Sequence, residues 1–280
     1  MAGMIETIIE PSRGWKSPGL GEVWDQRWLL MAFVGRDIKA RYKQTWIGIG
    51  WAFFQPALTA LFFSLFLGSA FVDGSVPYPL FVFSGFVPWS FFSTALVNTA
   101  GSVVAAEPLI KRVYYPRLLA PLAALGASLV DFLVAIAGVI VVAGFYGRYP
   151  HATLLWLPLW ITAVALAAAG LGTLLAALSV LYRDVRYLIP FLVQLGLFAT
   201  PVIFLPSINM RFTVGSGAAL RRVLTTMNPL NGLIAFGRAL LLGDPLPWSS
   251  FGVASAVCVG LFGFACLLFR RVEDRFADVL

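Results

Sequence analysis

Long apolar stretches separated by short polar segments fill most of this 280-residue chain. Six of them can be delimited, at residues 46–71, 79–100, 118–146, 153–182, 187–205 and 248–269. A helix needs about 20 apolar residues to cross a bilayer, and in hydrocarbon every backbone amide must be paired within the chain. The pattern therefore predicts an all-α integral membrane protein with six transmembrane helices.

The composition favours one membrane domain and no separate soluble domain. The chain is 60% hydrophobic and 12% charged, with a mean hydropathy of +0.87, whereas soluble domains carry about 25% charged residues. We expect residues 1–45 to form a cytoplasmic arm, 46–269 the six-span domain and 270–280 a cytoplasmic tail. The arm has neither the long apolar core nor the cleavage site of a signal peptide.

Basic residues are distributed unevenly between the two sides of the predicted bundle, and this bias sets orientation. Fifteen lie in the arm, in the loops after spans two and four, and in the tail, against five on the other side. Both termini are therefore expected in the cytoplasm. Attraction of this basic collar to anionic lipid explains the net charge of +7, so a nucleic-acid partner is not needed.

Residues 22–44 show a helical spacing of apolar side chains, with basic residues available to the opposite face. This pattern is typical of a helix that lies in the headgroup layer. The alternative is a plain membrane anchor, which would not explain why the helix leads directly into the first span. Three basic residues of this region lie near the predicted cytoplasmic rim: Arg36, Lys39 and Arg41.

Two further segments between the spans have more than one interpretation. The loop 107–117, EPLIKRVYYPR, is either an ordinary basic loop or a short docking helix for a cytoplasmic partner. The segment 206–247 contains an apolar run that is too short to span and is interrupted by Arg238. We expect two short re-entrant or interfacial helices there, broken at Asn228-Pro229, and the alternative is an exposed loop.

Inside the spans, aromatic residues crowd the first two stretches. Lipid-facing bulk explains many of them, but others are candidates to line a path for a substrate with apolar faces, such as those of sugar rings: Trp51, Phe54, Phe62 and Phe66. Asp131 lies well inside the third stretch, where a carboxylate needs a partner from another helix or subunit. A structural hydrogen bond and proton coupling both remain open for it.

Residue types that commonly serve as catalytic groups or metal ligands are scarce in this chain. It has one histidine and two cysteines, both in the last span, so we expect no catalytic residue and no metal site. None of its four lysines follows the glycine spacing of a phosphate-binding loop. If transport is driven by ATP, a separate chain must therefore bind ATP and Mg²⁺, and this chain holds no cofactor.

Several blocks together are similar to one family, the permease subunits of bacterial polysaccharide exporters among the ABC-2-type ABC transporters. They follow the family's order and cover nearly the whole chain: GRDIKARYKQTWIGIGWAFFQP (35–56), FSGFVPWSFFSTAL (83–96), PLIKRVYYPRLLAPL (108–122), LSVLYRDVRYLIPFLVQLGLFATPVIF (178–204), NPLNGLIAFGRALLLG (228–243) and FRRVEDRFADVL (269–280).

The resemblance implies a multi-pass protein of the bacterial cytoplasmic (inner) membrane, working as a homodimer with two copies of a cytoplasmic ABC ATPase. It implies a lipid-linked glycan as substrate and an amphipathic interface helix before span one. In the implied mechanism the substrate enters at Arg36, Lys39 and Arg41, which attract its pyrophosphate, and the outer gate includes Asn228, Pro229 and Arg238. The resemblance places the contact with the ATPase in the loop after span two, at Leu109, Ile110, Lys111, Arg112, Tyr114 and Arg117. Glu107-Pro108 departs from the family's pattern and puts the start of that coupling helix in doubt.

Three other functions compete with polysaccharide export. The nearest is an ABC-2-type permease for drugs or lipids, against which the aromatic first span and the VEDRFADVL tail are the main arguments. An intramembrane lipid-phosphate transferase would need clustered acids or histidines, and Asp184, Glu273, Asp274 and Asp278 are dispersed. A proton-coupled carrier is disfavoured because ionisable residues inside the spans are few.

Overall fold

The computed structural model describes residues 19–68, 76–149, 152–200, 202, 228–273 and 276, and the described part is helical without strands. The helices, with two 3₁₀ turns, are α1 (Leu20–Asp25), α2 (Arg27–Tyr42), η1 (Gly48–Gly50), α3 (Trp51–Leu67), α4 (Tyr78–Ala105), α5 (Glu107–Ile110), α6 (Leu119–Phe145), η3 (Ala152–Trp156), α7 (Leu157–Leu181), α8 (Val185–Ala199), α11 (Pro229–Leu242) and α12 (Trp248–Val272).

Five helical segments of the described chain are long and apolar enough to cross a membrane: Gly48–Leu67, Tyr78–Ala105, Leu119–Phe145, Ala152–Leu181 and Trp248–Val272. They confirm the all-α membrane fold. The fifth expected span, 187–205, is covered by α8, whose 15 residues reach about 22 Å at 1.5 Å per residue. Most of the stretch beyond Ala199 lies outside the described residues, so the sixth crossing stays a prediction.

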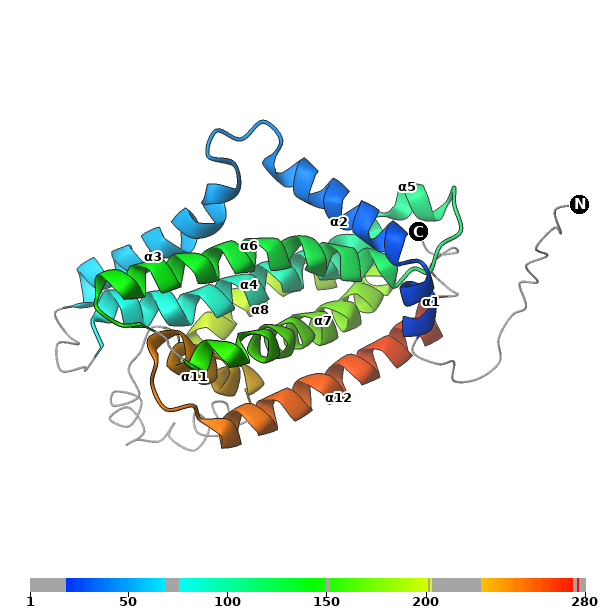
Figure 1. Ribbon diagram of the computed structural model, residues 1–280. Helices are drawn as coiled ribbons and strands as arrows, with labels where there is room; N and C mark the ends of the chain where they lie inside the picture. The colour runs from blue at the N-terminus through cyan, green and yellow to red at the C-terminus, as the bar shows by residue number, and fades with distance from the viewer. Residues whose placement is uncertain are drawn as a thin grey trace, which may run out of the picture.

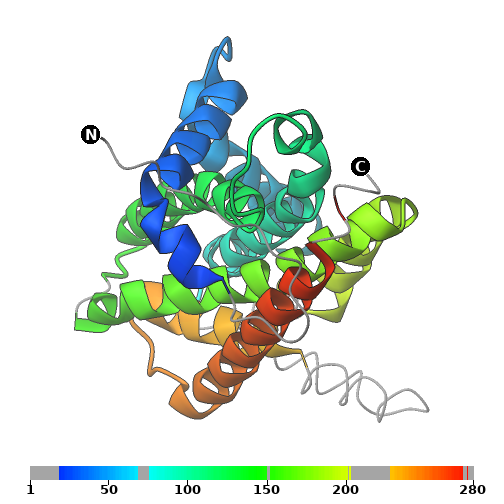
Figure 2. The same ribbon diagram turned by 90° about the vertical axis from the view of Figure 1, so that its right-hand side faces the viewer.

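Helix α4 occupies the centre of the bundle and contacts α3, α6, α7, α8 and α11, while α12 packs on α7 (Figures 1 and 2). Its aromatic side chains join the layers: the ring of Phe91 stacks on that of Phe132 from α6, with centroids 4.4 Å apart. Phe132 in turn lies 5.4 Å from the ring of Trp160 in α7. The Trp160 indole donates a hydrogen bond of 2.8 Å to the carbonyl of Leu233 in α11.

Helices α3 and α8 lie at the edge of this bundle and bury little of their surface. Pro56 and Ala60 are the buried residues of α3, and Ile189 is the buried residue of α8. Part of each helix also packs against the core, through Phe53, Phe63 and Leu67 of α3 and Val193 and Leu197 of α8, while most other large apolar side chains point outward. In a membrane such faces contact lipid or a second protein, because water is absent there.

The expected amphipathic segment forms two helices rather than one, with a break at Gln26 between α1 and α2. Its apolar side chains are also divided between two environments. Val34 packs against Gly126 of α6, where an added Cβ would come within 2.8 Å of its methyl group. Trp24, Trp28 and Met31 stay exposed, as expected of side chains that enter a headgroup layer.

One end of the bundle, which we call the basic end, collects α1, α5, the start of α6 and the last turn of α12 (Figure 2). Residues 1–18 of the arm, residues 206–227 of the outer segment and most of the tail beyond Glu273 lie outside the described residues.

Candidate functional site

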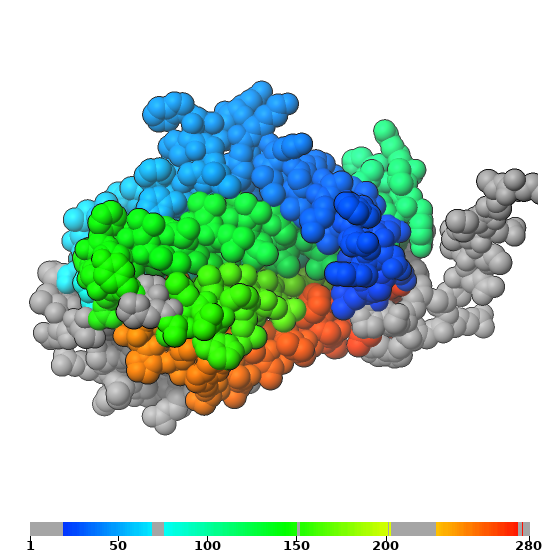
Figure 3. Space-filling model, in the orientation of Figure 1, coloured from blue at the N-terminus to red at the C-terminus, as the bar shows by residue number. Residues whose placement is uncertain are grey.

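The loop after α4 forms a small projection at the basic end (Figure 3). Pro108 lies in the first turn of α5, where a missing backbone N–H costs nothing, so the helix does begin at Glu107 despite the departure from the family's pattern. It ends after one turn, at Ile110. The exposed residues that follow are Lys111, Arg112, Val113 and Tyr114, the last with 75% of its surface accessible.

The base of this projection is anchored in an apolar cluster. Tyr115 is buried and meets the ring of Phe33 in α2 edge-on, with centroids 5.5 Å apart, and burial raises the pKa of its phenol. Leu118 is buried in the same cluster, and Leu109 and Ile110 pack against its edge. The predicted coupling residues therefore divide: three are exposed, two are half-buried, and Arg117 turns inward.

The C-terminal tail contributes to this anchor, which the sequence did not indicate. Phe276 is fully buried and meets the ring of Phe269 at 5.3 Å, and the guanidinium of Arg117 lies 5.9 Å from its ring centroid. Both ends of the described chain thus support the projection. The signal that the sequence offered is that Phe276 is the one aromatic residue in the tail 270–280.

An ion-pair network joins the two ends of the described chain. Arg270 donates to Glu22 of α1 and, at 2.7 Å, to Glu273. The side chains of Arg270 and Glu273 are only 10% and 9% exposed. Gly19 has a φ of 72°, and a Cβ there would come within 2.8 Å of the Arg270 Nε atom, so this turn requires a glycine.

We expect Arg270→Ala to lower the free energy of unfolding by about 3 kcal/mol, because it removes the shared cation of a largely buried ion-pair network. Thermal unfolding of the detergent-solubilised protein measures the effect. Arg183→Ala is the control, since Arg183 is exposed at the same end. Equal losses in the two variants would refute a specific role for the network.

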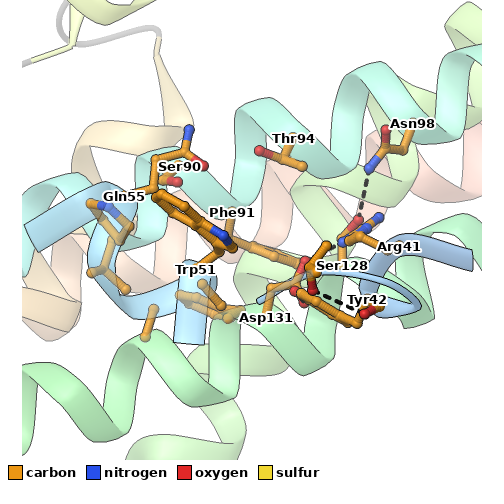
Figure 4. A pocket seen from close by; sticks show the side chains of 16 residues that line it. Arg41, Tyr42, Trp51, Gln55, Ser90, Phe91, Thr94, Asn98, Ser128 and Asp131 are labelled. Carbon is orange, nitrogen blue, oxygen red and sulfur yellow. Dashed lines mark hydrogen bonds and ion pairs between the residues drawn. The ribbon is translucent and has the colours of Figure 1, made fainter. Parts of the chain in front are cut away.

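Two neighbouring cavities lie between α2, α4 and α6. The first, of about 370 Å³, is lined at one end by Arg41 and Asp131 and at the other by Trp51 and Gln55 of α3 (Figure 4). The second, of about 490 Å³, lies nearer the basic end and is lined by Arg36 and Asp37 among others. Both are lined by Arg41 and Asn98.

Asp131 has two partners, both at the end of α2. Arg41 forms an ion pair with one carboxylate oxygen, and the hydroxyl of Tyr42 donates to the other. Burial, followed by this hydrogen bond, raises the pKa of Tyr42 to about 12, so Tyr42 keeps its proton and remains a donor at physiological pH. The prediction that Asp131 takes its partner from another helix is confirmed.

Of the residues predicted for substrate access, Arg36 and Arg41 both line the second cavity and Lys39 does not. Arg36 pairs with Asp37 at 2.8 Å and lies 4.9 Å from the ring centroid of Phe33, while Lys39 is exposed and lines neither cavity. Of the four aromatic residues predicted for the path, Trp51 lines the first of these two cavities, and the other three line neither. Phe54, Phe62 and Phe66 lie on the exposed face of α3.

The residues predicted for the outer gate lie in α11 or at its N-terminus, at the end opposite the basic end. Asn228 caps α11 by accepting from the Leu230 amide at 3.0 Å, and its amide donates to the Thr200 hydroxyl at 2.9 Å. Pro229 occupies the first turn of α11. Arg238 donates to the Val202 carbonyl at 3.0 Å, and its guanidinium lies 3.7 Å from the ring centroid of Phe81 in α4.

Asn228→Ala is expected to lower the free energy of unfolding by about 1 kcal/mol, because it removes both the helix cap and the bond to Thr200. Asn228→Asp keeps the capping oxygen and loses only the amide donor, so its effect should be smaller. Thermal unfolding of the two variants checks this order, and the reverse order would contradict the capping role.

The sequence of this chain is similar to those of known proteins. Residues 29–212 match the family described as ABC-2 type transporter. The chain belongs to the ABC-2 type transporter family. It is 28% identical to the O-antigen export system permease protein RfbA of Myxococcus xanthus, over 92% of this chain and 97% of the relative. It is 25% identical to an RfbA of Klebsiella pneumoniae, over 93% and 97%.

Membership of the ABC-2 type family makes the chain a multi-pass transporter subunit that works with an ABC ATPase. The resemblance seen in the sequence blocks is therefore confirmed. Among the residues that the structure describes, no three or more His, Cys, Asp or Glu side chains gather as metal ligands would. Cys258 and Cys266 are free and buried in α12.

Proposed function

We propose that this chain is the permease subunit of an ATP-driven exporter that moves lipid-linked polysaccharide, of O-antigen, capsule or teichoic-acid type, across the bacterial cytoplasmic membrane. The observation that carries the proposal is the similarity to O-antigen export permeases over nearly their whole length. The membrane bundle, the cavities and the exposed basic loop are consistent with that role.

The functional unit in this proposal is a homodimer bound to two ATPase chains. A path wide enough for a glycan needs more helices than one bundle of this size supplies. The outward aromatic faces of α3 and α8 are available to line or close such a path between two copies. The concentration of basic residues supports a cytoplasmic position for the basic end and both termini.

The loop after α4 provides the mechanical connection to the ATPase. It continues directly from α4, whose 28 residues run through the bundle and line both cavities. Its base is packed on α2 through the contact between Tyr115 and Phe33. A push on the exposed side chains of the loop therefore moves α2 and α4 together, and with them the walls of the cavities. ATP and Mg²⁺ belong to the partner chain.

Deletion of this chain in its native host tests the function. We expect the surface polysaccharide to disappear and its lipid-linked precursor to accumulate on the cytoplasmic side, because synthesis continues without export. Expression of the wild-type chain should restore the surface polymer. A deletion strain with normal surface polysaccharide would refute the proposal, as would loss of drug efflux alone.

A further inference from the structure

We propose that the two cavities along α4 form one binding groove for the diphosphate and first sugar of the lipid-linked glycan, and that Asp131 holds Arg41 while the groove is empty. The inference rests on the proposed function and specifies which part of the substrate this chain recognises.

The first argument is the continuity of the groove. Arg41 and Asn98 line both cavities, so the ion pair between Arg41 and Asp131 stands at their junction. Release of Arg41 from Asp131 would open one cavity to the other. The joined groove would then run from the basic end, where a substrate made in the cytoplasm arrives, towards the middle of the bundle.

The second argument is the polar lining of α4. Four polar residues repeat at every fourth position and line the cavities: Ser90, Thr94, Asn98 and Ser102. This spacing puts them on one face of the helix, over about 18 Å. Asn98 donates to the Ser128 hydroxyl of α6 at 3.2 Å. Burying a polar helix face inside a membrane domain costs free energy unless its polar groups have hydrogen-bond partners.

The third argument is hydrogen-bonding capacity that the described protein leaves unused. The side chains of Gln55, Ser90 and Thr94 line the first cavity and make no hydrogen bond to another side chain or carbonyl in the described part of the chain. Trp51 stands beside them at the wall (Figure 4). Amide and hydroxyl groups beside an aromatic ring suit a sugar, which offers hydroxyls at its edge and C–H groups on its face.

The charged residues of the groove also favour a diphosphate as ligand. Arg36 and Arg41 each pair with a carboxylate, Asp37 and Asp131, so the empty groove has balanced charge. A diphosphate offers more negative charge and more acceptor oxygens than one carboxylate, and arginine binds phosphate in a bidentate manner. Tyr42 would still donate to Asp131 after Arg41 has moved. The carboxylate therefore acts as an internal competitor for the phosphate.

Equilibrium binding to the wild-type complex with its ATPase, in nanodiscs without ATP, tests the inference. The probe is a fluorescent polyprenyl-diphosphate-linked disaccharide. We expect Arg41→Gln to weaken binding about tenfold, since it removes a charge-assisted contact. Asp131→Asn should strengthen binding several-fold, because the competitor loses its charge. A purely structural ion pair predicts weaker binding in both variants, and that result would overturn the inference.

Further variants separate folding from recognition and identify the ligand. Each complex must elute as the wild type does, and Arg41→Lys, which keeps the charge but loses the bidentate contact, should bind with intermediate affinity. Thr94→Val should weaken binding, whereas Thr162→Val, on the exposed face of α7, should not. Inorganic pyrophosphate should compete with the probe, and a polyprenyl-linked disaccharide without phosphate should bind no better to the wild type than to Arg41→Gln.

The binding and export measurements together separate failure of the groove inference from failure of the proposed function. If the wild type binds the probe and exports polymer while the groove variants match it in both, the groove inference fails and the exporter assignment stands. If the wild type neither binds the probe nor restores surface polymer, the proposed function itself fails.

Discussion

Replacing Arg112 and Tyr114 together, by Glu and Ala, is expected to reduce ATP-driven export at least tenfold without preventing membrane insertion. Both side chains are exposed at the tip of the basic loop, while the residues that anchor the loop are untouched. Arginine and tyrosine residues dominate the energy of protein interfaces, at about 2 kcal/mol or more each. Export into inverted vesicles and copurification of the ATPase measure the loss.

The matched control uses the same residue types at the same end of the bundle. Tyr182 and Arg183 are exposed in the turn between α7 and α8, and Arg183→Glu with Tyr182→Ala makes the same change of charge and aromatic area. We expect this pair to keep most of its export activity. Equal losses in both double variants would show that the basic end, rather than the loop, carries the contact.

The second large effect concerns the bundle itself. Trp160→Ala is expected to lower the free energy of unfolding by about 3–5 kcal/mol, because the indole is fully buried and joins α7 to α11 through its hydrogen bond to Leu233. Gly237 packs directly against the ring and has no side chain that could move into the space left by the indole.

Thermal unfolding in detergent measures this loss. Trp46→Ala is the matched control, since Trp46 is 98% exposed and its removal should change the unfolding temperature by a degree or so at most. If the two tryptophan variants lost the same stability, the central position of Trp160 would be refuted.

Hydrophobic length allowed five of the spans to be predicted, because the requirement to cross a bilayer with paired amides acts on each segment separately. Which face of each span packs against the rest of the protein was not predictable in the same way. A membrane is as apolar as a protein core, so the sequence of α3 does not show that Phe62 and Phe66 face outward while Phe53 packs against Gly138 of α6.

Long-range partners account for most of what the sequence could not show. Arg41 and Asp131 are 90 positions apart, and one chain without relatives aligned to it offers no signal for such a pairing. Phe276 was equally hidden, because a short charged tail favours solvent unless the fold brings it to a cluster. The charge and prolines of the loop after α4 left an ordinary basic loop and a docking helix both open, and its division into exposed and anchored residues was not predictable.

The central claim is that this chain supplies the path and another chain supplies the energy. The most direct measurement is transfer of a lipid-linked glycan across proteoliposomes that contain this chain with or without its ATPase. The account predicts ATP-dependent transfer only when both chains are present. Transfer by this chain alone, at a comparable rate and without ATP, would contradict it.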